Sequence, residues 1–456
     1  MSRRRLLIAA PALAAVLGAC RSERFDRVAE ARRAEVETAA RAEAEGFAPV
    51  GREATMDGAL GKAPARILTL AECERIAVRN NLAYRTRLLE TRLSDEQARS
   101  ALSALLPRGT AELTAKRRSN EPLVAAGTGV AAFEDQETRA FSLGLILPIF
   151  DFGATWYAWS AAQDVRDQER LAATRARQTL IRDVRVAYAQ LAGALRDVEL
   201  TQAEVAAAAE AHRTARSLER EGLSTAADTS FVEARAASAE LGFTLARRDL
   251  LLARSALART LSIPVWSDFG VDPKLPDPPP PPRTAGEVQD LERAAVLARP
   301  ELHAHDLERS IADARVRRAF AEFFPRLDAT PDFDWSSNSR VVNPAFFTGG
   351  LTVAHALLDG SATLSRYRAA GAQVDVERER ALLVAMSVTY EVDLRVLELS
   401  RAWDGIAAGE RLVEAQERLA REVRAQHREG LGSGADLARA VADEHAARRE
   451  LNRTRT

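Results

Sequence analysis

Hydrophobic and polar residues follow two different periods along this chain. From Leu68 to Pro107 good helix formers run with few breakers, which predicts a helix. Alternation takes over at about residues 108–117 and again at about 140–149, which predicts two β-strands joined by a long loop. A helical period then returns from about residue 151 and lasts to about residue 221.

The predicted long helix carries an apolar seam whose members step by three and four: Ile181, Val184, Tyr188, Leu191, Leu195 and Val198. Such a seam is typical of helices that pack along a partner helix. At 1.5 Å per residue the helix would be a rod roughly 105 Å long. A turn at Gly222 and a second helix to about Leu261 would complete a helical hairpin.

The second half of the chain repeats this order. A helical segment precedes alternating strands at about 326–335 and 347–357, and a long helix follows at about 359–429. The turn "REGLSTAAD" at 220–228 returns as "REGLGSGAD" at 428–436, offset by 208 residues. We interpret the chain as a tandem duplication, with repeats at 67–261 and 287–456.

Two features depart from a simple duplication. Residues 262–286 form a linker in which Pro278–Pro282 enforce an extended connector, a Pro-rich recognition motif being the alternative. The last helix, from about Ala435 to Thr456, is about a dozen residues shorter than its counterpart in the first repeat. It is either trimmed or completed by another segment, such as residues 21–62.

The N-terminus has the pattern of a secretory signal at residues 1–19: a basic start, an apolar run and small residues. It ends in Leu-Gly-Ala-Cys, which resembles a bacterial lipobox and makes Cys20 the expected lipid anchor, here for palmitate and other acyl chains. Alternatives are an ordinary signal with an incidental cysteine, or a faint twin-arginine signal. Residues 20–66 would be a tether, and Cys73 a buried, inert thiol.

The predicted strands bear on membrane crossing. No apolar run after residue 20 approaches the roughly 18 residues that a spanning helix needs. Transmembrane β-barrels close with at least about eight strands, and open edges are not tolerated in lipid. Because one chain offers four strands, copies must share a barrel. Three copies would give twelve strands and two would give eight.

Composition excludes several functions. The 64 Lys and Arg residues balance 65 Asp and Glu residues, so nothing favours nucleic acid. The sequence has no Ser-His-Asp set, Gly-rich phosphate loop or cysteine cluster, so we expect neither an enzyme nor a cofactor. His303 and His305 stand two apart on a helix and cannot share a face, so no metal site is expected.

Five segments together carry a family resemblance. In this order, "LTLAECERIAVRNNLAYR", "LLPR", "LGLILPIFDFG", "VRVAYAQL" and "REGLSTAADTSFVEARAASAEL" resemble the TolC-type outer-membrane efflux family, as an outer-membrane factor lipoprotein. The resemblance implies a mainly α-helical homotrimer with a shared membrane β-barrel of twelve strands and a periplasmic α-barrel of twelve helices. It also implies a passive exit duct for a tripartite efflux or secretion system, anchored in outer-membrane lipid. A periplasmic adaptor protein would connect it to an inner-membrane pump.

The resemblance also implies roles for the tips of the hairpins. Gly222, Leu223, Gly430 and Leu431 match the family's adaptor contact, although a glycine also ends a helix for structural reasons. A non-conducting structural lipoprotein that spans the periplasm is the alternative to a channel.

Asp228 and Asp436 match residues near the family's pore constriction, and helix N-capping is their alternative role. Arg439 stands where some relatives carry a second constricting Asp. His427 and Gly432 stand where the best-known lock has Tyr and Arg, so that lock is not expected here.

Overall fold

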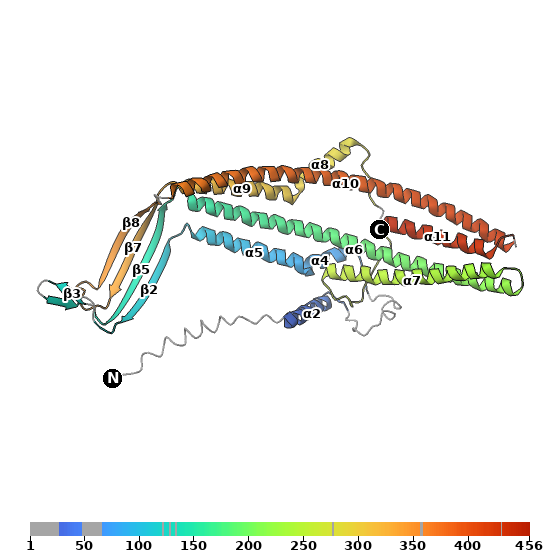
Figure 1. Ribbon diagram of the computed structural model, residues 1–456, viewed down its shortest axis with the longest axis horizontal. Coiled ribbons are helices and arrows are strands. Elements are labelled where there is room, and N and C mark those ends of the chain that lie inside the picture. Colours follow the sequence, from blue (N-terminus) through green and yellow to red (C-terminus); the bar gives the residue numbers. More distant parts are fainter. Residues whose placement is uncertain are drawn as a thin grey trace, which may run out of the picture.

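The protein is an elongated molecule with a β-sheet at one end and two helical hairpin tips at the other (Figure 1). The computed structural model describes residues 27–47, 66–120, 123–126, 129–132, 135–275, 278–355, 359–429 and 431–456. The order of helices, two long strands, long helix and returning helix occurs twice. The predicted fold class, a mainly helical tandem repeat with four long strands, is therefore confirmed.

Two strands from each repeat form one antiparallel sheet. Its order is β2 (Arg108–Arg117), β5 (Glu137–Phe150), β7 (Arg326–Ser336) and β8 (Ala345–Ala354). The central pairing of β5 with β7 joins the two repeats. Within the described residues β2 and β8 each have one neighbour in this sheet, so its two outer edges are unpaired. A small hairpin, β3 (Leu123–Ala126) with β4 (Gly129–Ala132), lies between β2 and β5 in sequence.

The two faces of the sheet differ in polarity because side chains alternate along each strand. On one face Phe333 stands opposite both Leu143 and Phe347. On the other face Gly144 stands opposite Asp332, and a Cβ on Gly144 would lie 2.8 Å from the Asp332 carboxylate.

The register of β5 shifts near its end. Strict alternation would place Ile149 on the apolar face with the residues before it. The structure has an irregularity between Pro148 and Phe150, and it places Phe150 opposite Leu327. Beyond a bulge of this kind, the side chains that face the apolar side of the sheet are shifted by one residue along the strand.

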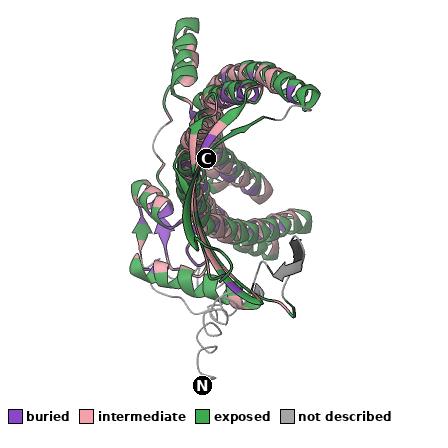
Figure 2. Ribbon diagram, turned by 90° about the vertical axis from the view of Figure 1, so that its left-hand side faces the viewer, coloured by how far each residue is buried: buried purple, intermediate pink, exposed green. Residues whose placement is uncertain are grey.

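Four helices extend from the sheet and two return from the tips. α5 (Leu82–Ser103), α6 (Ala154–Arg220), α9 (Pro300–Ala321) and α10 (Gly360–Arg428) extend from it. α7 (Ala226–Leu261) and α11 (Gly434–Arg455) return along α6 and α10. The 67 residues of α6 span about 100 Å. Seen from the sheet end, sheet and helices follow a curve (Figure 2).

The segments predicted as single helices before each strand pair are each broken once. Asn81 ends α4 (Leu70–Asn80) and also caps α5, because its side chain accepts from the Tyr84 N–H at 3.0 Å. In the second repeat Arg299 separates α8 (Ala285–Ala298) from α9, since a residue before proline is disfavoured in helical conformation.

The main hydrophobic core lies midway along the molecule. Val184 and Leu191 of α6 are buried there, in the predicted seam, together with Leu257 and Leu261 at the end of α7. β1 (Ile67–Leu68) pairs with β6 (Gly270–Val271) beside this core. Cys73 is also fully buried, and burial raises the pKa of its thiol to about 12, so it stays protonated and unreactive.

The N-terminal segment packs on the first repeat. α2 (Arg27–Ala44) leads to Phe47, whose ring meets the edge of Phe269, and to Glu45, which pairs with Arg79 at 3.2 Å. These contacts lie beside β6 and α4, so the described part of residues 21–62 does not complete the last helix. α11 instead ends against α6, where Asn452 donates to the Gly193 carbonyl at 2.9 Å.

The linker lies along the second repeat, where the Trp403 indole N–H donates to the Pro279 carbonyl at 2.7 Å. Among the described helices, none combines the length and the apolar character that crossing a bilayer requires.

Candidate functional site

The first tip is a tight turn between α6 and α7. The Leu223 N–H donates to the Leu218 carbonyl at 2.8 Å, and the Gly222 N–H donates to the Glu219 carbonyl at 3.0 Å. Gly222 has φ of 75°, the left-handed conformation that glycine adopts without strain. These bonds satisfy carbonyls at the helix end in the Schellman arrangement. The glycine therefore has a structural role whether or not a partner binds here.

The second tip repeats this geometry between α10 and α11. The Leu431 N–H donates to the Gln426 carbonyl at 2.9 Å, at the positions 208 residues after Leu223 and Leu218. Gly430 lies outside the described residues. Leu223 and Leu431 are 72% and 77% exposed, so each tip presents one large apolar side chain that the described residues leave mostly uncovered. Helix termination requires no such leucine, which makes both leucines candidate contacts for a partner.

At each tip a hydroxyl caps the returning helix, and an aspartate accepts a hydrogen bond from that hydroxyl. The N-caps are Thr225 and Ser433, whose hydroxyls accept from the N–H groups of Asp228 and Asp436 at 3.2 and 3.1 Å. The same hydroxyls donate to the carboxylates of these aspartates, at 2.8 Å in both tips. The alternative role of the aspartates as N-caps is thus corrected: they stand three residues after the cap, in the first turn, where negative charge is favourable.

Arg439 connects the two hairpins. Its guanidinium lies 3.7 Å from the Asp436 carboxylate, and it also stacks over the Phe231 ring of α7, 5.3 Å from the centroid. Both charged side chains are more than half exposed, so the ion pair contributes little to stability. A small apolar cluster of Ala215, Val232 and Ala438 lies between the hairpins nearby. The tips therefore form one unit within the chain.

The structure brings His427 and Gly432 into contact at the second tip. The His427 Nδ1 lies 3.1 Å from the Gly432 carbonyl oxygen, so this imidazole braces the second turn. Sequence reasoning missed this contact, because nothing in the residue types indicates it.

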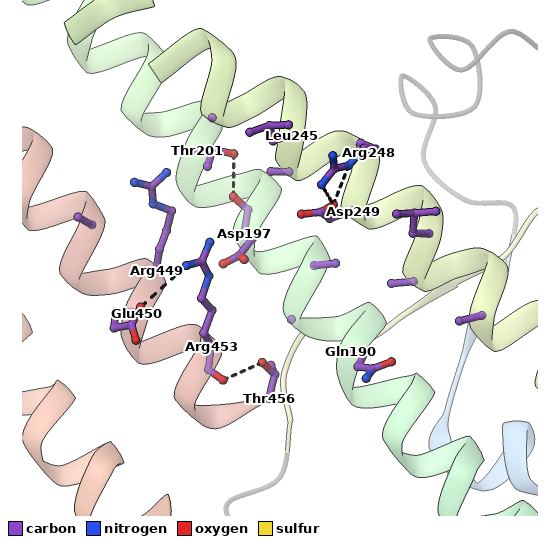
Figure 3. Close-up of a pocket in the computed structure, with 18 residues that line it drawn as sticks. Gln190, Asp197, Thr201, Leu245, Arg248, Asp249, Arg449, Glu450, Arg453 and Thr456 are labelled. Carbon is purple, nitrogen blue, oxygen red and sulfur yellow. Dashed lines mark hydrogen bonds and ion pairs between the residues drawn. The ribbon is translucent and has the colours of Figure 1, made fainter. Parts of the chain in front are cut away.

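A cleft of about 810 Å³ lies between α6, α7 and α11, further from the tips (Figure 3). Its charged side chains bind one another or their neighbours. Arg248 pairs with Asp249 at 2.8 Å, and Arg449 pairs with Glu204 at 3.1 Å. Asn452 donates to the Asp197 carboxylate at 2.7 Å. The polar groups of this cleft hold α11 against α6 and do not define a ligand.

A duplicated chain with a four-stranded sheet at one end and two long hairpins with matching tips at the other has the architecture of an outer-membrane efflux channel subunit. The chain belongs to the outer membrane efflux protein family, whose model matches residues 76–262 and 292–456, one segment in each repeat. Comparison with curated proteins gave no match. Cys20, the expected lipid anchor, lies outside the described residues.

Solved structures share the fold at low sequence identity. The outer membrane protein VceC of Vibrio cholerae is 16% identical with a TM-score of 0.70, over 88% of this chain and 95% of that chain. The CmeC outer membrane channel of Campylobacter jejuni is 14% identical with a TM-score of 0.74, over 85% and 82%. A membrane protein from Pseudomonas aeruginosa is 19% identical with a TM-score of 0.68, over 86% and 93%.

Proposed function

We propose that this protein is the exit duct of a tripartite efflux or secretion system, a passive homotrimeric conduit through the outer membrane and across the periplasm. The observation that carries the proposal is the open sheet. β2 and β8 each lack a partner on one side within the described chain, and unpaired edges are unfavourable in lipid. Three copies that pair β2 of one chain with β8 of the next would close a barrel of twelve strands.

The helical layer supports the same assembly. α10 lies at one edge of the layer and α5 and α7 lie at the other (Figure 1). Both edges carry apolar side chains that are more than half exposed: Leu89, Leu93, Leu241 and Leu252 on one, and Leu382, Leu383, Tyr390, Leu394 and Leu397 on the other. When one edge of a subunit binds the unlike edge of the next, the subunits form a closed ring if the rotation between neighbours adds up to a full turn. Helices α6, α7, α10 and α11 from each of three chains would then form a tunnel of twelve helices.

The tips are the proposed docking site for a periplasmic adaptor protein, and through it for an inner-membrane pump. Leu223 and Leu431 supply the exposed apolar contacts, and the glycine turns that carry them set their position. Cys20 would anchor the chain to the outer membrane through its acyl chains.

The test uses the full mature chain in detergent and in planar bilayers. Native mass spectrometry should find three chains per particle, and reconstituted protein should conduct ions. A folded monomer would contradict the assembly. A stable trimer that never conducts, even with substitutions at both tips, would favour the non-conducting structural lipoprotein.

A further inference from the structure

Two helices bring a histidine and two glutamates together between the sheet and the main core. His305 and Glu308 lie on α9, one turn apart, and Glu377 lies on α10. One nitrogen of His305 and one carboxylate oxygen of each glutamate all lie within 4.8 Å of one another. On the sequence alone no metal site is expected at His305, because His303 cannot share its face of the helix. Indeed His303 contacts the Leu297 carbonyl instead, at 3.1 Å.

Two atoms of this cluster are buried without a hydrogen bond. Glu377 is only 6% exposed, and its Oε2 has no partner among the described residues. The Nδ1 of His305 also lacks a well-formed hydrogen bond, although it stands 2.7 Å from Glu308 Oε2. A buried carboxylate oxygen without a partner is costly, since it loses its hydration and gains nothing in return. The cluster is therefore incomplete as a purely protein structure.

Outer hydrogen bonds orient both carboxylates in the same way. Gln168 of α6 donates to Glu308 Oε1 at 2.8 Å. Gln373 and Arg380 both donate to Glu377 Oε1, the arginine at 2.9 Å. In each glutamate one oxygen is thus held from outside and the other is left for the cluster. Metal-binding carboxylates and imidazoles are oriented by this kind of outer partner.

The first repeat offers an internal comparison. α5 and α9 correspond at an offset of 218 residues, and α6 and α10 at 208, so the equivalent positions are Arg87, Glu90 and Glu169. Arg87 pairs with Glu90 at 2.8 Å, which places a guanidinium where the second repeat has an imidazole. Both glutamates recur, and only the nitrogen-bearing member differs, arginine in the first repeat and histidine in the second.

We propose that His305, Glu308 and Glu377 bind a divalent transition-metal ion of the Zn²⁺ class, which replaces the charge that Arg87 supplies in the first repeat. One imidazole and two carboxylates are ligands that Zn²⁺ accepts, and imidazole disfavours Mg²⁺ and Ca²⁺. Ligand atoms around a tetrahedral zinc ion stand about 3.3 Å apart, so small side-chain rotations suffice. The ion would tie α9 to α10 and, through Gln168, to α6.

The test is a zinc titration of the untagged full chain in detergent. Metal is first removed with a chelator, and the protein then competes for added zinc with a chromophoric zinc indicator. The wild type should bind one zinc ion per chain at this site, and His305→Gln and Glu377→Gln should lose it. Gln168→Ala, which removes only an outer hydrogen bond, should weaken binding by about 10–100-fold. His303→Gln is the matched control on the same helix and should bind as the wild type does.

A second variant separates metal binding from folding. His305→Arg copies the first repeat, so it should fold, bind no zinc at this site and show no rise of its unfolding temperature with zinc. The wild type should show that rise. If the wild type binds zinc no more tightly than His305→Gln and His305→Arg, the proposal is wrong, and the cluster is a contact among protein side chains alone. Trimer formation and conductance are measured separately, so this outcome leaves the proposed function unaffected.

Discussion

Substitution of Gly222 by alanine should loosen the first tip without any steric clash. Gly222 has φ of 75°, and a Cβ built on it would meet no atom within 4 Å. The effect of a methyl group at this position is therefore confined to backbone strain. That strain acts on the bond from the Leu223 N–H to the Leu218 carbonyl, which closes the turn.

The magnitude follows from two opposing terms. The left-handed conformation costs an L-residue roughly 1–2 kcal/mol. Alanine also restricts the unfolded chain, which offsets about 0.4–1 kcal/mol of this cost. The net destabilisation of the turn is then about 1 kcal/mol, which corresponds to a roughly fivefold increase in its opening equilibrium. Because the turn lies at the end of the molecule, far from the main core, the global unfolding temperature should change little.

Hydrogen exchange measured on a peptide that spans residues 218–226 reports this opening directly. In Gly222→Ala the Leu223 amide should exchange about five times faster than in the wild type. Gly222→Asn should recover part of the protection, since asparagine tolerates this conformation better.

Gly432→Ala is the matched control in the other tip. Gly432 is not among the residues with positive φ, and its Cβ would stand 3.5 Å from the nearest atom. Its exchange rate should stay unchanged. Equal exchange in Gly222→Ala and the wild type, or an equal effect of Gly432→Ala, would refute the assignment of the glycine to a left-handed turn.

Three further predictions concern the anchor, the pore and pH. Mass spectrometry of the mature N-terminus should show an acylated Cys20, and a free terminus at the next residue would exclude it. In bilayers Asp436→Ala should raise conductance and weaken cation preference, whereas Arg439→Ala should strengthen that preference; unchanged selectivity in both would leave Asp436 with only its structural role in the first turn of α11. Burial lowers the pKa of His445, so below about pH 6.5 the unfolded chain binds more protons and stability falls. Denaturant titrations at pH 7 and 5 should show a smaller loss in His445→Gln.

Periodicity predicted the long elements because each buries a continuous face. The alternation at 108–117 corresponds to β2, and the seam around Val184 lies in the buried face of α6. Breaks within helices depend on tertiary contacts instead. Asn81 ends α4 partly because its side-chain amide donates to the Thr260 carbonyl, 179 residues away. A single sequence carries no sign of that contact.

Some candidate-site residues can likewise be predicted from local sequence, whereas others depend on tertiary contacts. The sequence predicts a helix start after each tip but assigns the capping role to the aspartates. The true caps, Thr225 and Ser433, could have been found, because a hydroxyl residue followed three positions later by an acidic residue is a known start signal for a helix. His305 and Glu377 stand 72 positions apart, and only the packing of α9 on α10 brings them together. Spacing rules applied to one helix could reject His303 with His305, but they could not find the glutamate on the neighbouring helix.

The duplication itself constrains how a partner can bind the tips. Both turns keep the same backbone bond and the same exposed leucine, since Leu223 and Leu431 occupy equivalent places. The first three of the four positions between leucine and aspartate differ: residues 224–226 are Ser-Thr-Ala, and residues 432–434 are Gly-Ser-Gly. A trimer would therefore present two sets of three tips that share an apolar contact and differ in the residues beside it. A partner that contacts only the leucine would bind all six tips. A partner that binds only three of the tips must also contact the neighbouring residues that differ between them.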